Sequence, residues 1–430
     1  MNKKKLIFPI FLASLIGLAV LYELWQDITR RENKQSFSAN KEEVTLNNTE
    51  RTIQDLEGRL GRNQDDVNLY ILLSNSYFQK VRETADVDLY KKIDNLMDKA
   101  NKKYPENPEI FATKAMVALG RHDFAAALEF GQKAYRFNPS KPLYLGIIGD
   151  AQVELGQYEE AVESIQKMMD LKPSYSSFAR TGYLRELYGD IEGAKEMFEK
   201  AISAGSPYPE NIAASLVDLG KLYFRTDLEK ATQTFNQALS VYKDYPPALE
   251  GLGKVSFAKK EYKKTIEYFV KALDVLPIAQ YATDLGDVYS KIGEEDKAKQ
   301  YYTLALAAYQ KAELSGVNTD LEMALFLADH DMQLDQALEK AQADYIVRPD
   351  NIYVADVLAW TLHKNGKSIE AQTYTASAMR QGEYDPLILF HAGVIKARNN
   401  QSEEAKRLFH KAISLHPYFS IQYSSLLSIL

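Results

Sequence analysis

The chain has 430 residues, too many for one ordinary globular core unless the fold is elongated or built of parallel units. Its composition, 46% hydrophobic and 26% charged, indicates a folded protein, and a net charge of -7 with interleaved acidic and basic residues leaves no basic patch that would favour nucleic acid. The lack of cysteine excludes disulfides, thiolate metal sites, thiol nucleophiles and a lipidated cysteine anchor.

An apolar run near the N-terminus predicts a membrane segment. Three lysines (residues 3–5) precede LIFPIFLASLIGLAVLY, an uncharged stretch that spans roughly 25 Å as a helix, and Trp25 follows at the position of an interfacial anchor. We expect residues 1–26 to form a signal anchor or transmembrane helix, with the N-terminus cytoplasmic and the remainder extracytoplasmic, in a bacterial periplasm. The alternative is a signal peptide cleaved near Gly17 or Ala19, which would leave a secreted or periplasmic protein.

Two short segments are predicted to connect this anchor to the folded body. Residues 27–50 are polar without a sustained apolar period, which is typical of a spacer. The next stretch, RTIQDLEGRLGRN, lies within residues 51–66 and predicts a lone helix that caps the folded body at its N-terminal end.

A helical unit then recurs along the chain. The copies align on one small residue, at intervals of 33 to 39 residues: Ala127, Ala161, Ala194, Ala231, Thr265, Ala298, Ala337, Ala371 and Ala405. Twelve residues earlier, most copies carry a second small residue such as Gly253, and prolines such as Pro173 close several units. Small residues on facing helices allow close approach, a glycine such as Gly156 or Gly293 ends the first helix in a left-handed turn, and the proline stops the second helix.

Each unit is therefore expected to be a helical hairpin. One hairpin cannot bury its own apolar face, so the units must stack into an all-α, right-handed α-solenoid whose stability sums over neighbours. The stretch AAYQKAELSGVNTD is longer than its counterparts, which predicts a lengthened loop before the eighth unit.

This pattern resembles the tetratricopeptide repeat (TPR). The stretches LGQYEEAVESIQKMMDLKP, YGDIEGAKEMFEKAISAGSP and LGDVYSKIGEEDKAKQYYTLALAAY carry that repeat's small and aromatic positions. We count about ten such hairpins over residues 67–419, followed by a C-terminal capping segment over 420–430.

The resemblance implies that the protein binds protein or peptide partners in a concave groove lined by the first helix of each hairpin. Placing the groove positions on this sequence gives candidate partner-binding residues with an acidic and aromatic character: Asp150, Tyr183, Asp287, Glu322, Phe326, Asp356, Trp360 and His363. Trp360 has two interpretations, as a groove anchor or as a packing residue between neighbouring helices.

A chemical alternative rests on Asp329, His330, His363 and His391, which occupy neighbouring repeats. Imidazole and carboxylate groups together can bind zinc or act as acid and base, but the same residues can cap a helix end and pack between neighbours. No phosphate-binding or hydrolase motif is present and the repeats leave no room for a catalytic domain, so we expect no enzyme, cofactor or small-molecule substrate. The sequence thus predicts a membrane-anchored scaffold or adaptor, in bacterial envelope assembly, secretion or maturation.

Overall fold

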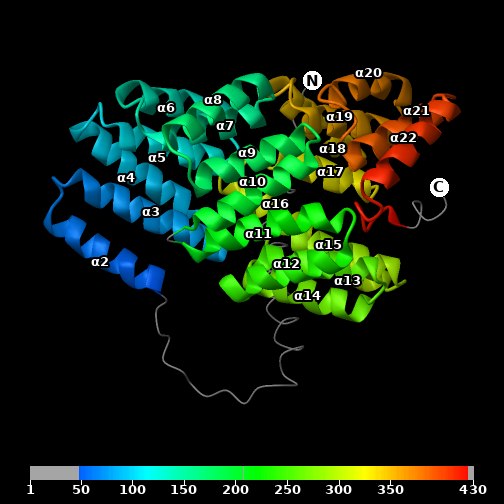
Figure 1. Ribbon diagram of the computed structural model, residues 1–430, viewed down its shortest axis with the longest axis horizontal. Helices are drawn as coiled ribbons and strands as arrows, with labels where there is room; N and C mark the ends of the chain where they lie inside the picture. The colour runs from blue at the N-terminus through cyan, green and yellow to red at the C-terminus, as the bar shows by residue number, and fades with distance from the viewer. Residues whose placement is uncertain (1–47, 207, 425–430) are drawn as a thin grey trace, which may run out of the picture.

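The computed structural model describes residues 48–206 and 208–424, which form helices joined by short loops (Figure 1). The first half of these helices are α2 (Asn48–Arg62), α3 (Val67–Thr84), α4 (Leu89–Lys103), α5 (Pro108–Gly120), α6 (Phe124–Phe137), α7 (Pro142–Glu154), α8 (Tyr158–Leu171), α9 (Tyr175–Leu187), α10 (Ile191–Ala204), α11 (Pro209–Phe224) and α12 (Leu228–Val241). The second half are α13 (Pro246–Ala258), α14 (Tyr262–Val275), α15 (Ala279–Lys291), α16 (Glu295–Leu314), α17 (Asp320–Asp329), α18 (Leu334–Val347), α19 (Ile352–Lys364), α20 (Ser368–Ala378), α21 (Pro386–Arg398) and α22 (Ser402–Leu415).

Within this described part of the chain, α3 to α22 pair into ten antiparallel hairpins, as the repeat spacing predicted. Each hairpin has an odd-numbered first helix and an even-numbered second helix. In Figure 1 the early hairpins, in blue and cyan, and the last hairpins, in orange and red, lie at opposite ends of the long axis, with α16 to α18 between them. The result is an all-helical solenoid.

The small residues act as the sequence analysis predicts. Ala161, Ala231 and Ala298 are completely buried between helices. A side-chain carbon on Gly253 would lie 2.3 Å from Cε1 of Phe269, so the two helices of that hairpin are in contact at the glycine. The turn residue Gly156 has φ +76°, in the left-handed region predicted for the end of a first helix.

Two boundaries differ from the prediction. The N-terminal helix α2 begins at Asn48, inside the predicted spacer, and ends at Arg62. The predicted long loop before the eighth hairpin is mostly helix: α16 continues to Leu314, because QKAEL extends it with good helix formers, and only residues 315–319 connect it to α17.

The solenoid closes on itself through a set of bonds that we call the closure contact. It joins the α7–α8 turn to two loops, the one that precedes α19 and the one that follows α20. Arg348 pairs with Glu154 at 3.2 Å, and the side-chain amide of Asn351 donates to the Glu154 carbonyl at 2.9 Å. The backbone N–H of Ile352 donates to the Tyr158 hydroxyl at 3.0 Å. The Arg380 guanidinium donates to the carbonyl of Gly156.

A second long-range contact lies beside it. Nδ1 of His122, in the α5–α6 turn, donates to the Asn318 carbonyl at 2.8 Å, and the Asn318 N–H donates to the Arg121 carbonyl at 2.9 Å. Val317 is buried in the core of the first hairpins, with Ile110 among its partners. The third and ninth hairpins, and the second and eighth, are therefore neighbours in space.

The predicted membrane anchor over residues 1–26 lies outside the described residues, as does most of the predicted spacer over 27–50. None of the helices within residues 48–206 and 208–424 combines the length and the apolarity that crossing a bilayer requires.

Candidate functional site

The predicted groove residues all lie on first helices of hairpins, but they differ in exposure. Asp287, Phe326, Asp356 and Trp360 are buried, with 3 to 8% of their surface exposed. Tyr183 is 42% exposed. Of the others, Asp150 pairs with Arg180 at 2.7 Å, Glu322 lies 3.7 Å from Nδ1 of His122, and His363 contacts Ser368.

Four first helices, α15, α17, α19 and α21, bring the buried members together on what we call the inner face, defined by Asp287, Phe326, Trp360 and His391. The sequence register placed three of these residues in the groove. Their burial means that neighbouring side chains occupy the surface that a partner was expected to contact.

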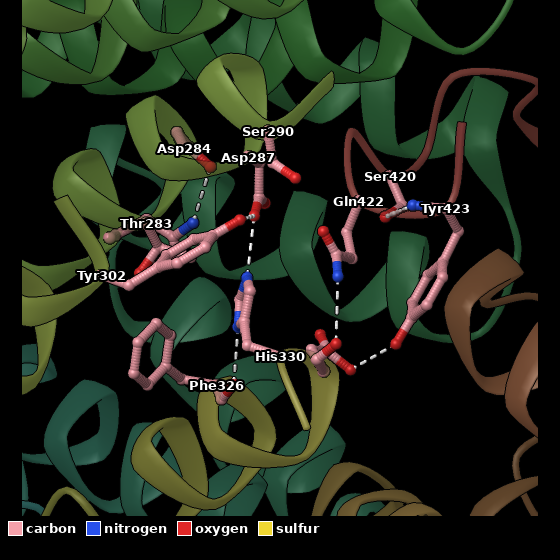
Figure 2. Close-up of polar contacts among 12 residues, drawn as sticks. Thr283, Asp284, Asp287, Ser290, Tyr302, Phe326, His330, Ser420, Gln422 and Tyr423 are labelled. Carbon is pink, nitrogen blue, oxygen red and sulfur yellow. Dashed lines mark hydrogen bonds and ion pairs between the residues drawn. The ribbon is translucent and has the colours of Figure 1, made fainter. Parts of the chain in front are cut away.

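His330 is the centre of the first polar network on the inner face (Figure 2). Its Nε2 lies 2.8 Å from Oδ1 of Asp287 and its Nδ1 lies 2.6 Å from the Phe326 carbonyl. The Tyr302 hydroxyl donates to the same Asp287 oxygen at 3.0 Å. Both partners of the imidazole are acceptors, so both ring nitrogens carry a proton. Burial alone would lower the pKa of His330, but the hydrogen bond and the charge of Asp287 raise it above its usual value.

Trp360 is the centre of the second network. Its indole N–H donates to Oδ1 of Asp329 at 2.8 Å, and its ring stacks on His391 with centroids 4.2 Å apart. Nδ1 of His391 donates to Asp356 at 2.8 Å, and this carboxylate raises the pKa of His391 against the lowering effect of burial. Trp360 therefore packs between helices with Tyr423 against its edge, and at 3% exposure it has no free face in this structure.

The metal-dependent alternative is not favoured by this geometry. His330 and His391 each pair with a different carboxylate, and Nδ1 of His363 lies 2.9 Å from the Ser368 hydroxyl. Across residues 48–206 and 208–424, no group of three or more histidine, aspartate or glutamate side chains is placed to hold a metal ion. Each of the four residues instead bonds to side chains outside this set, with Asp329 accepting from Trp360 and Tyr423, which agrees with the packing alternative.

An open cavity remains between α9, α11, α19 and the loop that precedes α21, and we call it the tyrosine cleft. Its volume is about 210 Å³, and three tyrosines line it: Tyr183, Tyr353 and Tyr384. The ring of Tyr384 is held by two glycines, since a side-chain carbon on Gly189 or Gly382 would come within 2.4 Å of it. Tyr384 is nonetheless 42% exposed, so it is a fixed aromatic ring with a free face.

Charged side chains in the cleft are mostly paired. Arg225 bonds Glu186 at 2.5 Å, and Lys221 lies 3.3 Å from Asp218. Asp385 caps α21 by accepting from the backbone N–H groups of residues 387 and 388, and burial raises its pKa above the usual value. The cleft thus presents aromatic surface and hydrogen-bonding groups already fixed in place.

Of the candidate partner-binding residues named above, Tyr183 is the one that lines the cleft. Tyr384 and Asp385 lie in the connection between α20 and α21, which the repeat register does not treat as groove. The signal that could have found Tyr384 is the pair of glycines at 189 and 382, but they are 193 positions apart in the chain, so only the fold brings them to one ring.

Fold and site together define an all-helical repeat protein of stacked hairpins with a cleft on its inner side. The family model described as tetratricopeptide repeat matches residues 144–175 and 279–311, which correspond to the hairpins α7–α8 and α15–α16. These two hairpins of the chain are thus similar to the tetratricopeptide repeat. The matched model describes a structural repeat and is not a catalytic family.

Two curated relatives are similar over part of their length. TPR repeat-containing protein YpiA of Bacillus subtilis (strain 168) is 26% identical, over 64% of this chain and 64% of its own length. TPR repeat-containing protein MJ1428 of Methanocaldococcus jannaschii is 23% identical, over 51% of this chain and 44% of its own length. The chain thus spans less than two thirds of either relative. Among solved structures, yeast Tom70 is 15% identical over 96% of this chain and 94% of its own, with a TM-score of 0.37.

Proposed function

We propose that this protein is a scaffold that binds a segment of a partner protein in the tyrosine cleft. The observation that carries the proposal is Tyr384, whose ring is held between Gly189 and Gly382 yet is 42% exposed. Aromatic side chains that are already ordered lose little entropy when a partner covers them, and such residues dominate binding energy at protein interfaces. Tyr183 and Tyr353 extend this surface along the cleft.

The proposal includes tethering to a membrane. Its support is the sequence of residues 1–26, in which three lysines precede an apolar run long enough to cross a bilayer core with its interfacial residues. This orientation places the repeats outside the cytoplasm, where the scaffold serves envelope assembly, secretion or maturation. Protease added to spheroplasts should digest the repeats. Full protection of the repeats would contradict the proposal that they lie outside the cytoplasm.

The binding site is tested with one variant and one matched control. Partner proteins are crosslinked in intact membranes and recovered with the full chain, with Tyr384→Ala or with Tyr188→Ala. Tyr188 is also an exposed tyrosine, 37% exposed, and it lies at the end of α9 outside the lining of the cleft.

Tyr384→Ala should reduce capture by about tenfold or more, as expected for loss of an aromatic anchor, while Tyr188→Ala should leave capture unchanged. Circular dichroism melts of both variants identify any loss that comes from unfolding. Normal capture by a folded Tyr384→Ala protein would contradict the assignment of the cleft.

A further inference from the structure

The chain turns back after α22 and lays residues 416–424 along the inner face. We call this stretch the C-terminal segment. Its side chains contact α11, α17, α19 and α21, which belong to four different hairpins. A cap on the end of a solenoid needs only to cover the last hairpin, and that was the role predicted from the sequence for residues 420–430. The described part of that stretch, residues 420–424, also contacts helices of earlier hairpins, and residues 425–430 lie outside the described residues.

The segment is held chiefly by Tyr423. Its hydroxyl donates to Oδ1 of Asp329 at 2.5 Å, and the same oxygen also accepts from the Trp360 indole. Its ring lies 4.7 Å from the ring of Phe390 and meets the ring of Trp360 edge-on at 6.0 Å. Gln422 adds a bond from its side-chain amide to the Asp329 carbonyl at 3.0 Å.

Burial and aromatic contacts extend along the rest of the segment. Ile421 and Tyr423 are 9% and 7% exposed, and both belong to the same core cluster as Phe326 and Trp360. At the start of the segment, the ring of His416 meets Phe224 of α11 edge-on at 4.9 Å. Burial, assisted by nearby Arg225, lowers the pKa of His416 to about 3, so its ring is neutral where it packs.

The mode of contact is that of a bound peptide. Residues 416–423 form turns and bends and no regular helix. The segment is held by side chains, since Gln422 and Tyr423 both bond to Asp329. We call the surface under the segment, formed by Asp329, Trp360, Phe390 and His391, the trough. The trough and the tyrosine cleft share helix α21, because Ile388 lines the cleft while Phe390 and His391 contact Tyr423.

We propose that the C-terminal segment is an internal ligand of the inner face, and that the trough accepts a partner peptide of the same chemistry. That peptide carries an aliphatic residue followed two positions later by a tyrosine, whose hydroxyl donates to Asp329. The proposal deepens the proposed function, because it identifies a second part of the binding surface and the kind of segment that fits it. A partner that enters the trough must displace residues 416–424, so the segment lowers the affinity for weak partners.

The expected size of this effect follows from covalent linkage. A ligand on the same chain competes at an effective concentration in the millimolar range, so a free peptide binds measurably only after the internal copy is weakened. Tyr423→Ala removes the hydrogen bond to Asp329 and the ring contact with Phe390. This variant should therefore open the trough to a free peptide.

The test uses the full chain and the fluorescein-labelled peptide HPYFSIQYS, which reproduces residues 416–424. Fluorescence anisotropy should show binding to Tyr423→Ala that is about tenfold or more tighter than binding to the unaltered chain, and Tyr423→Phe should lie between them. The same peptide with alanine in place of its last tyrosine should bind all three proteins weakly. Tyr188→Ala, which alters a tyrosine outside the trough, should behave like the unaltered chain.

Thermal melts separate an internal ligand from a cap. If the segment is a ligand, the peptide added to Tyr423→Ala restores the melting temperature of the unaltered chain. A folded Tyr423→Ala protein that binds the peptide no better than the unaltered chain would overturn the proposal. A variant that melts early and gains no stability from the peptide would also overturn it, because the segment would then be only a cap. Neither outcome affects the assignment of the tyrosine cleft, which is tested at Tyr384.

Discussion

The closure contact makes Gly156 the most sensitive turn residue in the solenoid. A side-chain carbon there would lie 2.1 Å from the carbonyl carbon of Asp350 and 2.5 Å from the backbone nitrogen of Asn351. Neither atom belongs to a flexible side chain, so Gly156→Ala must push the α18–α19 loop away from the α7–α8 turn. Gly293 is the matched control, because it occupies the same position after a first helix, has φ +82°, and has nothing within 4 Å of its added carbon.

The free energies of unfolding of Gly156→Ala and Gly293→Ala should differ only by the cost of losing the closure contact. The left-handed conformation costs a non-glycine residue about 1 to 2 kcal/mol, which is the whole expected effect of Gly293→Ala. Gly156→Ala also breaks the bonds of Arg348, Asn351, Ile352 and Arg380 described above. At about 0.5 to 1.5 kcal/mol for each of these bonds, the further loss is about 2 to 6 kcal/mol.

Urea denaturation and small-angle X-ray scattering measure the two parts of this prediction. Gly156→Ala should unfold at lower urea than Gly293→Ala and should have a larger radius of gyration, because a solenoid without closure is free to extend. Equal destabilisation by the two substitutions, with unchanged scattering, would refute the closure of the solenoid through this turn.

Three further predictions concern the core. Trp360→Ala should destabilise the protein by about 3 to 5 kcal/mol in a denaturation assay, while capture at the tyrosine cleft at low temperature stays normal. Gly253→Ala should cost about 1 to 3 kcal/mol by overpacking against the fully buried Phe269, whereas Gly61→Ala, in α2 with open space around it, should stabilise by about 0.4 to 1 kcal/mol. The raised pKa of His330 adds stability that is complete below its unfolded pKa of about 6.5 and is lost as the pH rises through the folded value, so His330→Gln should destabilise more at pH 5.5 than at pH 8.5.

The hairpins could be predicted from the sequence because their determinants are local. Ala161 and Gly253 mark close helix contacts, and Gly156 marks a left-handed turn, within units that repeat every 33 to 39 residues. The register also placed Asp287 and Trp360 on the first helices that face inward. Burial of these residues could not be predicted, because it depends on what covers the inner face.

Closure and the tyrosine cleft depend on contacts between distant hairpins. Asn351 meets a carbonyl 197 positions away, and nothing in the repeat pattern distinguishes it from other caps of first helices. Tyr384 becomes a fixed, exposed ring only because two loops bring glycines to it. Such contacts follow from the small rotation between successive hairpins, which accumulates along the solenoid and is not encoded in any one repeat.

The most direct test of this account is a distance between the two sides of the closure contact. Because the chain has no cysteine, spin labels can be attached at Glu159→Cys and Asp350→Cys, two exposed positions beside the α7–α8 turn and in the α18–α19 loop. Pulsed electron paramagnetic resonance should give one short, narrow distance distribution in the otherwise unaltered chain, and Gly156→Ala should lengthen and broaden it. A long, broad distribution already present without Gly156→Ala would contradict the closed solenoid on which the cleft depends.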